Sequence, residues 1–115
     1  MIIESYSFGQ MIIDGREYGK DLMILPDGEI VCPWWRKTGH ELILADIEVI
    51  VTARPSILVI GTGSSGLMRP ATGLSTILKA KGIRTVILPT KQAANEYNSL
   101  KAKESKVAAC FHLTC

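Results

Sequence analysis

The stretch ILVIGTGSSG, residues 57–66, decides the fold class because four consecutive apolar residues run directly into a glycine-rich loop. A short apolar run of this kind predicts a strand that is buried on both faces, as in parallel sheets that carry helices on each side. The loop has the spacing G-x-G-x-x-G, which is typical of dinucleotide-binding enzymes when a helix opens inside the motif. The stretch therefore predicts a buried parallel strand, and its surroundings decide whether a nucleotide site follows.

The surroundings of the loop argue against a dinucleotide site. Pro70 stands four residues after Gly66 and the predicted helix cap is Thr72, so the loop and the helix are separated. The carboxylate that binds the ribose should stand near the end of the next strand, at Leu88, and no acidic residue is found there. We therefore predict no nicotinamide or flavin cofactor.

Two interpretations of the loop remain open. Its glycines can simply permit a tight exit from the strand. Alternatively, the loop amides and the hydroxyls of Thr62, Ser64 and Ser65 form a small anion-binding nest. The second interpretation has a structural basis, because open α/β sheets bind ligands at the carboxyl ends of their parallel strands.

The C-terminal half predicts helices that alternate with strands. Thr72 and Thr90 are plausible helix caps, and residues 84–88 and 107–113 are apolar strands. Crossovers of this length join parallel strands by right-handed connections. We therefore predict that residues 57–60, 84–88 and 107–113 are neighbouring strands of one sheet that is covered on both faces.

The N-terminal part predicts paired strands followed by a loop and a helix. The dipeptide Asp14-Gly15 follows an apolar run and supports the positive φ angles of a hairpin turn, and Pro26-Asp27-Gly28 repeats the arrangement. Residues 34–40 predict an ordered loop, and residues 46–53 predict a helix that ends before the break at Arg54-Pro55-Ser56.

The composition predicts one globular domain over residues 1–115. Apolar residues make up 47% of the chain, charged residues make up 21%, and the formal charge is +2, which is ordinary for a domain with a single core. The cations are scattered except at Lys101, Lys103 and Lys106, and aromatic residues are few. We therefore expect no nucleic-acid-binding surface, which needs a basic groove and stacking aromatics.

The sequence also bears on the compartment. No apolar stretch approaches the length of about 20 residues that a membrane span needs. The first residues resemble a strand rather than a targeting leader. Three widely spaced cysteines indicate a reducing compartment rather than a disulfide framework. A cytoplasmic location is therefore expected.

Six segments, taken in their order and spacing, carry a resemblance to a known family: SYSFG, IDGREY, WWRKTGH, LVIGTGSSG, ILPTKQAANEYN and CFHLTC. Over essentially the whole chain the sequence resembles a family of small domains of unknown function, whose members include the mitochondrial respiratory complex I assembly factor three and an adipogenesis-associated cytoplasmic protein. The chain looks like the short archaeal, bacterial or cytoplasmic members.

The resemblance implies a fold and a role. The implied fold is a three-layer α/β domain, in which a central mixed, mostly parallel sheet of roughly five strands has helices on both faces and an added N-terminal β-hairpin layer. The mitochondrial member acts as a protein-binding assembly factor. The family offers no established catalytic residues that could be transferred to this chain.

The cysteines and histidines near the C-terminus suggest two readings. Cys110, His112 and Cys115, with Cys32 elsewhere, supply thiolate and imidazole groups that are able to bind zinc. Cys110 and His112 stand two residues apart in an apolar strand, however, and no two cysteines are close in sequence. We favour packing of the thiols, because a free cysteine behaves as a small buried hydrophobe, and we predict no bound metal.

Trp34 and Trp35 define a candidate interaction surface, because large aromatic side chains dominate binding hot spots. Equally, one of the two can cover the edge of the core. If the glycine loop, the tryptophan segment and the last strand leave the sheet at related edges, their polar groups surround one cleft. The residues predicted for this binding cleft are Arg36, His40, Gly61, Thr62, Gly63, Ser64, Ser65, Gly66, Thr90 and His112.

Two functional classes remain after this reading. We predict a small soluble domain that acts as a non-enzymatic protein-binding or assembly module, because no acid and base pair, metal cluster or nucleophile with its base stands out. The alternative is a small-molecule or anion-binding protein, or an enzyme, that uses the cleft at residues 61–66. The expected partner is an unidentified protein or a small anionic ligand, and the expected state is a monomer or a weak homodimer.

Overall fold

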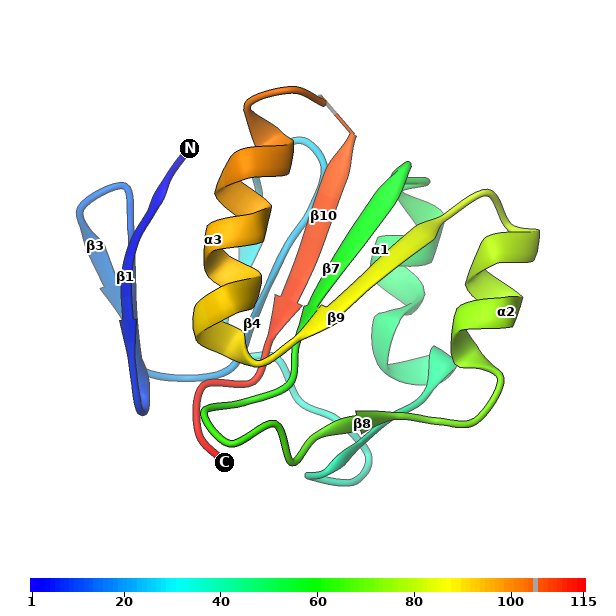
Figure 1. Cartoon of the computed structure of the whole chain (residues 1–115), viewed down its shortest axis with the longest axis horizontal. Helices are drawn as coiled ribbons and strands as arrows, with labels where there is room; N and C mark the ends of the chain where they lie inside the picture. Colours follow the sequence, from blue (N-terminus) through cyan, green and yellow to red (C-terminus); the bar gives the residue numbers. More distant parts are fainter. Residues whose placement is uncertain (105) are drawn as a thin grey trace.

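A computed structural model of the chain describes residues 1–104 and 106–115, and Figure 1 shows how the elements are arranged. The strands are β1 (Ile3–Ser7), β2 (Gln10–Ile13), β3 (Arg16–Tyr18), β4 (Leu22–Ile24), β5 (Ile30–Val31), β6 (Glu41–Leu42), β7 (Ile57–Gly61), β8 (Arg69–Pro70), β9 (Arg84–Leu88) and β10 (Val107–Phe111). The helices are the 3₁₀ helix η1 (Leu44–Ile47) and the α-helices α1 (Glu48–Thr52), α2 (Leu74–Ala80) and α3 (Thr90–Lys101).

The central sheet has five strands in the order β5-β4-β10-β7-β9. Strands β10, β7 and β9 are parallel, with Ile57 of β7 opposite Val107 on one side and Arg84 on the other. Strand β4 pairs with β10 in the antiparallel direction, and β5 pairs with β4 in the antiparallel direction. The predicted adjacency of the three strands is therefore confirmed, although β10 ends at Phe111 rather than at residue 113, and the sheet is mixed as expected.

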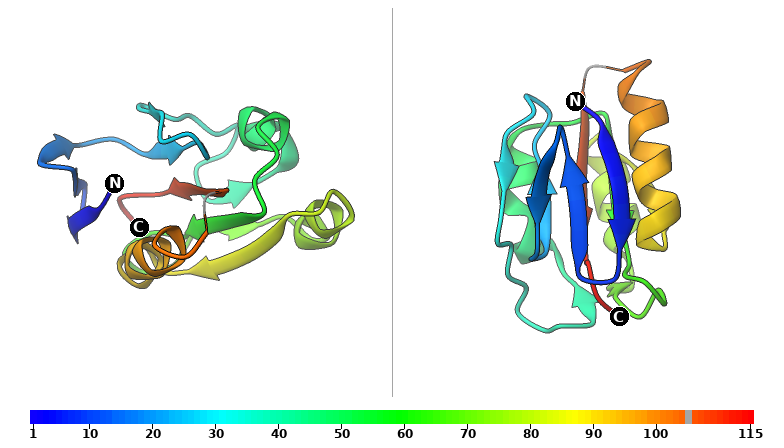
Figure 2. Two further views of the ribbon diagram at one scale, coloured as in Figure 1. Left: turned by 90° about the horizontal axis from the view of Figure 1, so that it is seen from above. Right: turned by 90° about the vertical axis from the view of Figure 1, so that its left-hand side faces the viewer.

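Helices cover both faces of the central sheet, because the apolar residues of its strands alternate in direction. Ile57 and Val59 pack with Tyr97 of α3, whereas Leu58 and Ile60 pack with Ile50 of α1 and with α2. Figure 2 shows α1 and α3 on opposite sides of the sheet. All five residues of β7 are buried, which explains the continuous apolar run from which its strand was predicted.

The N-terminal hairpins form as the turn residues predict. Strands β2 and β3 pair across Asp14-Gly15, where both residues have positive φ, and β1 adds a third strand. This small sheet packs Ile3, Met11 and Ile13 into the core that α3 shares with the central sheet. The chain is thus an α/β domain with an added N-terminal β layer, as the family resemblance implies.

Two predicted helix caps are wrong. Helix α2 begins after Gly73, which has a φ of +85°, and helix α3 begins after Pro89; neither start has a side-chain cap hydrogen bond. Thr72 therefore does not cap α2. Thr90 lies inside α3, and its hydroxyl makes two hydrogen bonds to other segments instead. The long-range bonds compete successfully with the local bond that a cap would make.

Strands β6 and β8 form a small parallel sheet that the sequence did not predict, and one predicted helix is divided. The predicted helix at residues 46–53 is observed as η1 followed by α1. Within residues 1–104 and 106–115, the longest helix is α3 with 12 residues, and none is long and apolar enough to cross a bilayer.

Candidate functional site

The candidate site lies where the three parallel strands end. Gly61 of β7 stands opposite Phe111 of β10 and Leu88 of β9, so the segments that follow all three strands leave the sheet at the same edge. These segments are the glycine loop at residues 62–66, the start of α3 and the C-terminal residues 112–115. We call this the carboxyl edge.

Thr90 connects all three segments. Its hydroxyl accepts a hydrogen bond from the Gly63 amide at 2.8 Å and donates one to the His112 carbonyl at 2.6 Å, and the residue is fully buried. Thr62 strengthens the same edge, because its hydroxyl donates to the Leu88 carbonyl at 3.1 Å. The hydroxyls of these two predicted site residues are thus used to join strand ends.

The glycine loop holds the C-terminal residues of its own chain. The Ser64 amide donates to the Thr114 carbonyl at 2.7 Å, and the amides of Ser65 and Leu67 donate to the main-chain oxygen of Cys115 at 3.2 and 3.0 Å. Loop amides of this kind form an anion nest when they are free. Here the amides of Ser64, Ser65 and Leu67 already have backbone oxygen partners.

Two of the glycines are required by close contacts. A Cβ at Gly63 would lie 2.3 Å from the main-chain carbon of Cys115, and the φ of Gly63 is +106°. A Cβ at Gly61 would lie 2.6 Å from Cδ1 of Phe111. The motif G-x-G-x-x-G therefore permits a close crossing of two backbone segments rather than the approach of a pyrophosphate.

A buried ionic cluster lies beside the loop. Nη1 of Arg36 lies 2.8 Å from Oδ2 of Asp21, and Nδ1 of His112 lies 2.8 Å from the same oxygen. The other carboxylate oxygen of Asp21 accepts the Leu113 amide at 2.7 Å. Arg36 also donates to the Gly39 carbonyl at 2.9 Å. The cluster joins the start of β4, the loop at residues 34–40 and the end of β10.

The cluster sets the charge of Asp21. Burial by itself raises the pKa of this carboxyl, but the hydrogen bonds from His112, the Leu113 amide and Arg36 outweigh burial and lower the pKa below its usual range. The side chain of Arg36 is only 5% exposed, and its guanidinium also stacks 4.8 Å from the ring centroid of Trp34. The buried cation thus has a carboxylate and an aromatic face as partners.

Two buried nitrogen atoms in the cluster lack partners among the described residues. They are Nε of Arg36 and Nε2 of His112. The ring of His40 meets the ring of His112 edge-on at a centroid distance of 6.1 Å. His40 itself is exposed, so it lies at the rim of the cluster. The structure therefore brings together Arg36, His40 and His112, which the sequence placed in one cleft.

Large apolar side chains are exposed around the same C-terminal residues. Trp35 is 74% exposed and lines a hollow of about 210 Å³ together with Leu113 and Thr114. Phe8 is 66% exposed and precedes Gly9, whose amide donates to the Leu113 carbonyl at 2.7 Å. Leu67 is 46% exposed and bonds to Cys115 as described above. We call Phe8, Trp35 and Leu67 the apolar rim.

Trp34 and Trp35, which were predicted to form one interaction surface, have different environments. Trp34 is buried, and its indole nitrogen donates to the Asp46 carbonyl at 2.9 Å, so it belongs to the core. Only Trp35 is available to a partner. The hydroxyl residues Ser64 and Ser65 are exposed, although their amides bond to the Thr114 and Cys115 main-chain oxygens.

Sequence reasoning missed Asp21 and Phe8. Asp21 directly precedes the buried strand β4. An acidic residue next to a buried apolar strand is a signal that could have suggested a buried ion pair. Phe8 stands in the turn between β1 and β2, and only the long-range pairing of that turn with Leu113 gives it a place at this edge.

Cys110 packs as a hydrophobe. Its thiol lies in the core between the sheet and helices α1 and α2, and burial raises its pKa. Cys32 and Cys115 are half-buried and unpaired. Within residues 1–104 and 106–115, no three His, Cys, Asp or Glu side chains gather in a way that could hold a metal ion.

Comparison with known families and structures agrees with the resemblance drawn from the sequence. The family model described as "Protein of unknown function (DUF498/DUF598)" matches residues 3–112. A conserved hypothetical protein from Pyrococcus horikoshii OT3 is similar to this chain, with 26% sequence identity, a TM-score of 0.84 and coverage of 100% of both chains. The predicted resemblance to a family of unknown function is therefore confirmed.

Two bacterial structures extend the likeness. A structure described as an outer membrane protein from Bartonella henselae has 25% identity and a TM-score of 0.81, with coverage of 98% of this chain and 94% of that one. A Bordetella pertussis protein described as a Mth938-like domain has 17% identity and a TM-score of 0.66, with coverage of 97% and 85%. The second likeness concerns the fold alone.

Proposed function

The chain belongs to the DUF498/DUF598 family of unknown function, and from this premise we propose that it is a non-enzymatic protein-binding module whose partner docks on the apolar rim of Phe8, Trp35 and Leu67. The single observation that carries the proposal is the 74% exposure of Trp35 beside a hollow at the carboxyl edge. Exposed aromatic side chains next to a hollow are typical of binding hot spots.

The rim is supported by a rigid base. Arg36, the next residue after Trp35, is fixed by its bonds to Asp21 and to the Gly39 carbonyl. The amide of Gly9, next to Phe8, and the amide of Leu67 itself bond to the C-terminal segment. Binding of a partner would therefore cost little conformational entropy at the rim, because the segments that carry the three side chains are already held in place.

The alternative of an anionic ligand in the glycine loop has weaker support. An anion there would have to displace the backbone oxygens of Thr114 and Cys115 from the amides of Ser64, Ser65 and Leu67. It would exchange internal hydrogen bonds for ligand bonds and would open the edge at the same time. The proposal therefore places the partner on the outer surface, over the rim.

The finer parts of the proposal follow from the family and the composition. One family member, the mitochondrial one, helps to assemble other proteins, and we include such a role in the proposal for this chain. A cytoplasmic location is expected from the cysteine content, and a monomer or weak homodimer is carried here as part of the proposal. None of these affects the choice of surface.

The proposal is tested by substitution on the rim. Purified wild-type protein and the variants Trp35→Ala and Phe8→Ala are used as baits, and bound proteins are quantified. The matched control is Val49→Ala, because Val49 is also an exposed apolar residue, at 53%, but lies on α1. We expect each rim variant to lose the specific partner by about tenfold or more, while the control retains it.

Circular dichroism and thermal unfolding establish that the variants are folded. A partner that is retained equally by Trp35→Ala, Phe8→Ala and wild type contradicts the proposal. Recovery that falls equally in Val49→Ala contradicts it too, since that result places the surface elsewhere or reports only general apolar adhesion.

A further inference from the structure

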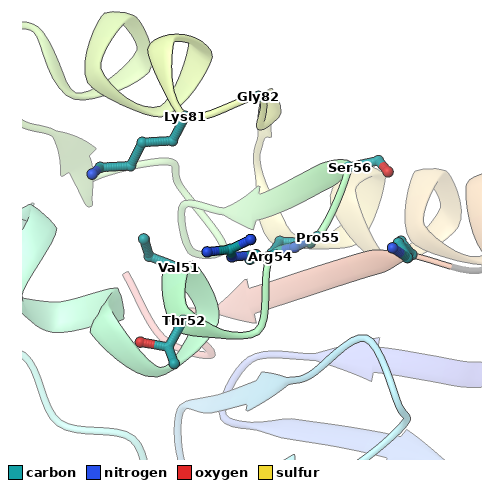
Figure 3. A pocket seen from close by; sticks show the side chains of 8 residues that line it. Val51, Thr52, Arg54, Pro55, Ser56, Lys81 and Gly82 are labelled. Carbon is teal, nitrogen blue, oxygen red and sulfur yellow. The ribbon is translucent and has the colours of Figure 1, made fainter.

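A second hollow lies at the opposite edge of the central sheet, where the parallel strands begin. It has a volume of about 590 Å³ and is formed by the end of α1, the segment before β7, the turn after α2 and the residue before β10. Figure 3 shows Lys81 and Arg54 reaching this region from two different segments. We call it the amino edge.

Three cations line the hollow. Arg54, Lys81 and Lys106 come from three segments that are far apart in the sequence, and the lining contains no carboxylate. Their side chains have no ion pair or hydrogen bond with another residue in the described part of the chain. Like charges that line one hollow without a counter-charge create a positive potential that attracts anions.

The distribution of charge along the chain strengthens this potential. Residues 49–115 contain nine Lys and Arg against two Asp and Glu, a formal charge of +7, whereas residues 1–48 contain four against nine. The net value of +2 therefore conceals two oppositely charged halves. The hollow is formed wholly by the positive half.

The backbone at the hollow is held in an uncommon conformation. Arg54 has a φ of +53°, which is rare for a residue other than glycine, asparagine or aspartate. It precedes the buried Pro55, and the Ser56 amide donates to the Lys106 carbonyl at 2.8 Å. The segment of Arg54 is thus tied directly to the segment of Lys106. Arg54 directly follows Ala53, the C-cap of α1, and a left-handed residue at this position commonly ends a helix.

We propose that the amino edge binds a small ligand that carries two or more phosphate groups. Phosphate is suited to this lining, because the Arg54 guanidinium is able to donate two parallel hydrogen bonds and the lysines act as point charges. Three cations on separate segments suit several phosphates better than one. The hollow lies within the range of about 300–1,000 Å³ that is typical of small-molecule sites.

This site is independent of the protein-binding surface proposed above. The two are at opposite ends of the same strands, and no residue lines both. The apolar rim and the phosphate site are therefore tested by different variants, and either proposal is able to fail without the other.

The test is a titration of ¹⁵N-labelled protein followed by NMR at low ionic strength. The probes are tripolyphosphate, pyrophosphate and inorganic phosphate, with citrate as an anion that lacks phosphorus. We expect saturable shifts at the amides of Ser56 and Gly82, an affinity that rises with the number of phosphates, and weaker binding of citrate. The amides of Ser64 and Ser65 report the glycine loop and should stay unchanged.

Variants separate this site from general attraction of anions. Arg54→Gly removes the guanidinium and suits the positive φ, so it is expected to fold and to weaken tripolyphosphate binding about tenfold. The double variant Lys81→Gln with Lys106→Gln should weaken it by about tenfold or more. The matched control Lys91→Gln removes an exposed cation from α3 and should change the affinity by less than about twofold.

Three results would each overturn the proposal. The first is the lack of a saturable shift with tripolyphosphate. The second is a set of shifts centred on Ser64 and Ser65, which would place the anion in the glycine loop. The third is equal weakening by Lys91→Gln and by Arg54→Gly, which would show attraction to the net charge alone.

Discussion

The two edges of the same three parallel strands use charge in opposite ways. At the carboxyl edge, Asp21, Arg36 and His112 contact one another inside the protein, and the apolar rim lies around the same C-terminal residues. At the amino edge, Arg54, Lys81 and Lys106 are exposed and have no acidic partner in the described part of the chain. Charge therefore contributes to folding at one edge and remains available for binding at the other.

This difference has a measurable consequence. Substitutions at the carboxyl edge should change the free energy of unfolding by several kcal/mol, because buried groups lose their partners. Substitutions of the amino-edge cations should leave stability almost unchanged, because exposed charges contribute little to it.

The largest expected effect is that of Gly63→Ala. The new Cβ would lie 2.3 Å from the main-chain carbon of Cys115, and alanine is strained at a φ of +106°. We expect a loss of about 4 kcal/mol or more in the free energy of unfolding, measured by urea denaturation. The control is Gly39→Ala, where nothing lies within 4 Å of the new Cβ. Equal stability of the two variants would contradict the close crossing at Gly63.

Removal of the buried carboxylate is next in size. Asp21→Ala leaves the guanidinium of Arg36 buried without its anion, which costs about 3–5 kcal/mol. The control is Asp27→Ala, because Asp27 is exposed and, within residues 1–104 and 106–115, accepts only the Glu29 amide at 2.9 Å. It should lose about 1 kcal/mol. Chemical denaturation measures the loss in the free energy of unfolding for both variants. Equal losses would indicate that Asp21 forms a surface ion pair rather than part of a buried cluster.

The hydroxyl of Thr90 gives a smaller effect. Thr90→Val keeps the shape of the side chain but leaves the Gly63 amide and the His112 carbonyl without this partner, at a cost of about 2–3 kcal/mol. Thr90→Ser should recover most of the stability because it restores the hydroxyl. Thr85→Val is the control, since the Thr85 hydroxyl makes only a 3.5 Å contact with Ser75 among the described residues. Loss of stability in Thr90→Ser comparable to that in Thr90→Val would indicate packing rather than hydrogen bonding.

The fold could be predicted from the sequence because its determinants are local. The run at residues 57–60 is apolar throughout since both of its faces are buried, and Asp14-Gly15 adopts the turn that its residues favour. Thr72 and Thr90 show the limit of local reasoning. A threonine before an apolar face suits a helix cap, but the bonds that Thr90 makes reach residues 27 and 22 positions away.

The site was predicted in part for the same reason. Arg36, His40 and His112 were expected to meet because their segments were predicted to lie at one edge of the sheet. Asp21, which holds the cluster together, was not predicted, because it lies 91 residues from His112 in sequence. The amino edge was also missed. A signal for it exists, because a cation stands shortly before each parallel strand, at Arg54, Lys81 and Lys106, and the starts of parallel strands share an edge.

The two edges should also differ in their response to acid. The pKa of Asp21 is lower in the folded protein than in the unfolded chain, so its contribution to stability is complete above the unfolded value of about 3.9. That contribution is lost as the pH falls through the lower folded value, because the unfolded chain then binds more protons. Denaturation of wild type and Asp21→Asn between pH 7 and pH 3 measures it. Wild type should lose more stability on acidification than the variant does, and identical slopes would contradict the ionised cluster.

The smallest expected effect is that of Lys81→Gln at the amino edge. Removing one of three like charges around the hollow relieves repulsion, so stability should rise by no more than about 0.5 kcal/mol at low ionic strength. Because the Debye length falls to about 3 Å at 1 M salt, the gain should disappear there. Lys91→Gln, remote from the hollow, should show no such gain at either salt concentration. A loss of stability above about 1 kcal/mol in Lys81→Gln would mean that this lysine has a structural partner. The amino edge would then use charge in the same way as the carboxyl edge, and the contrast between them would fail.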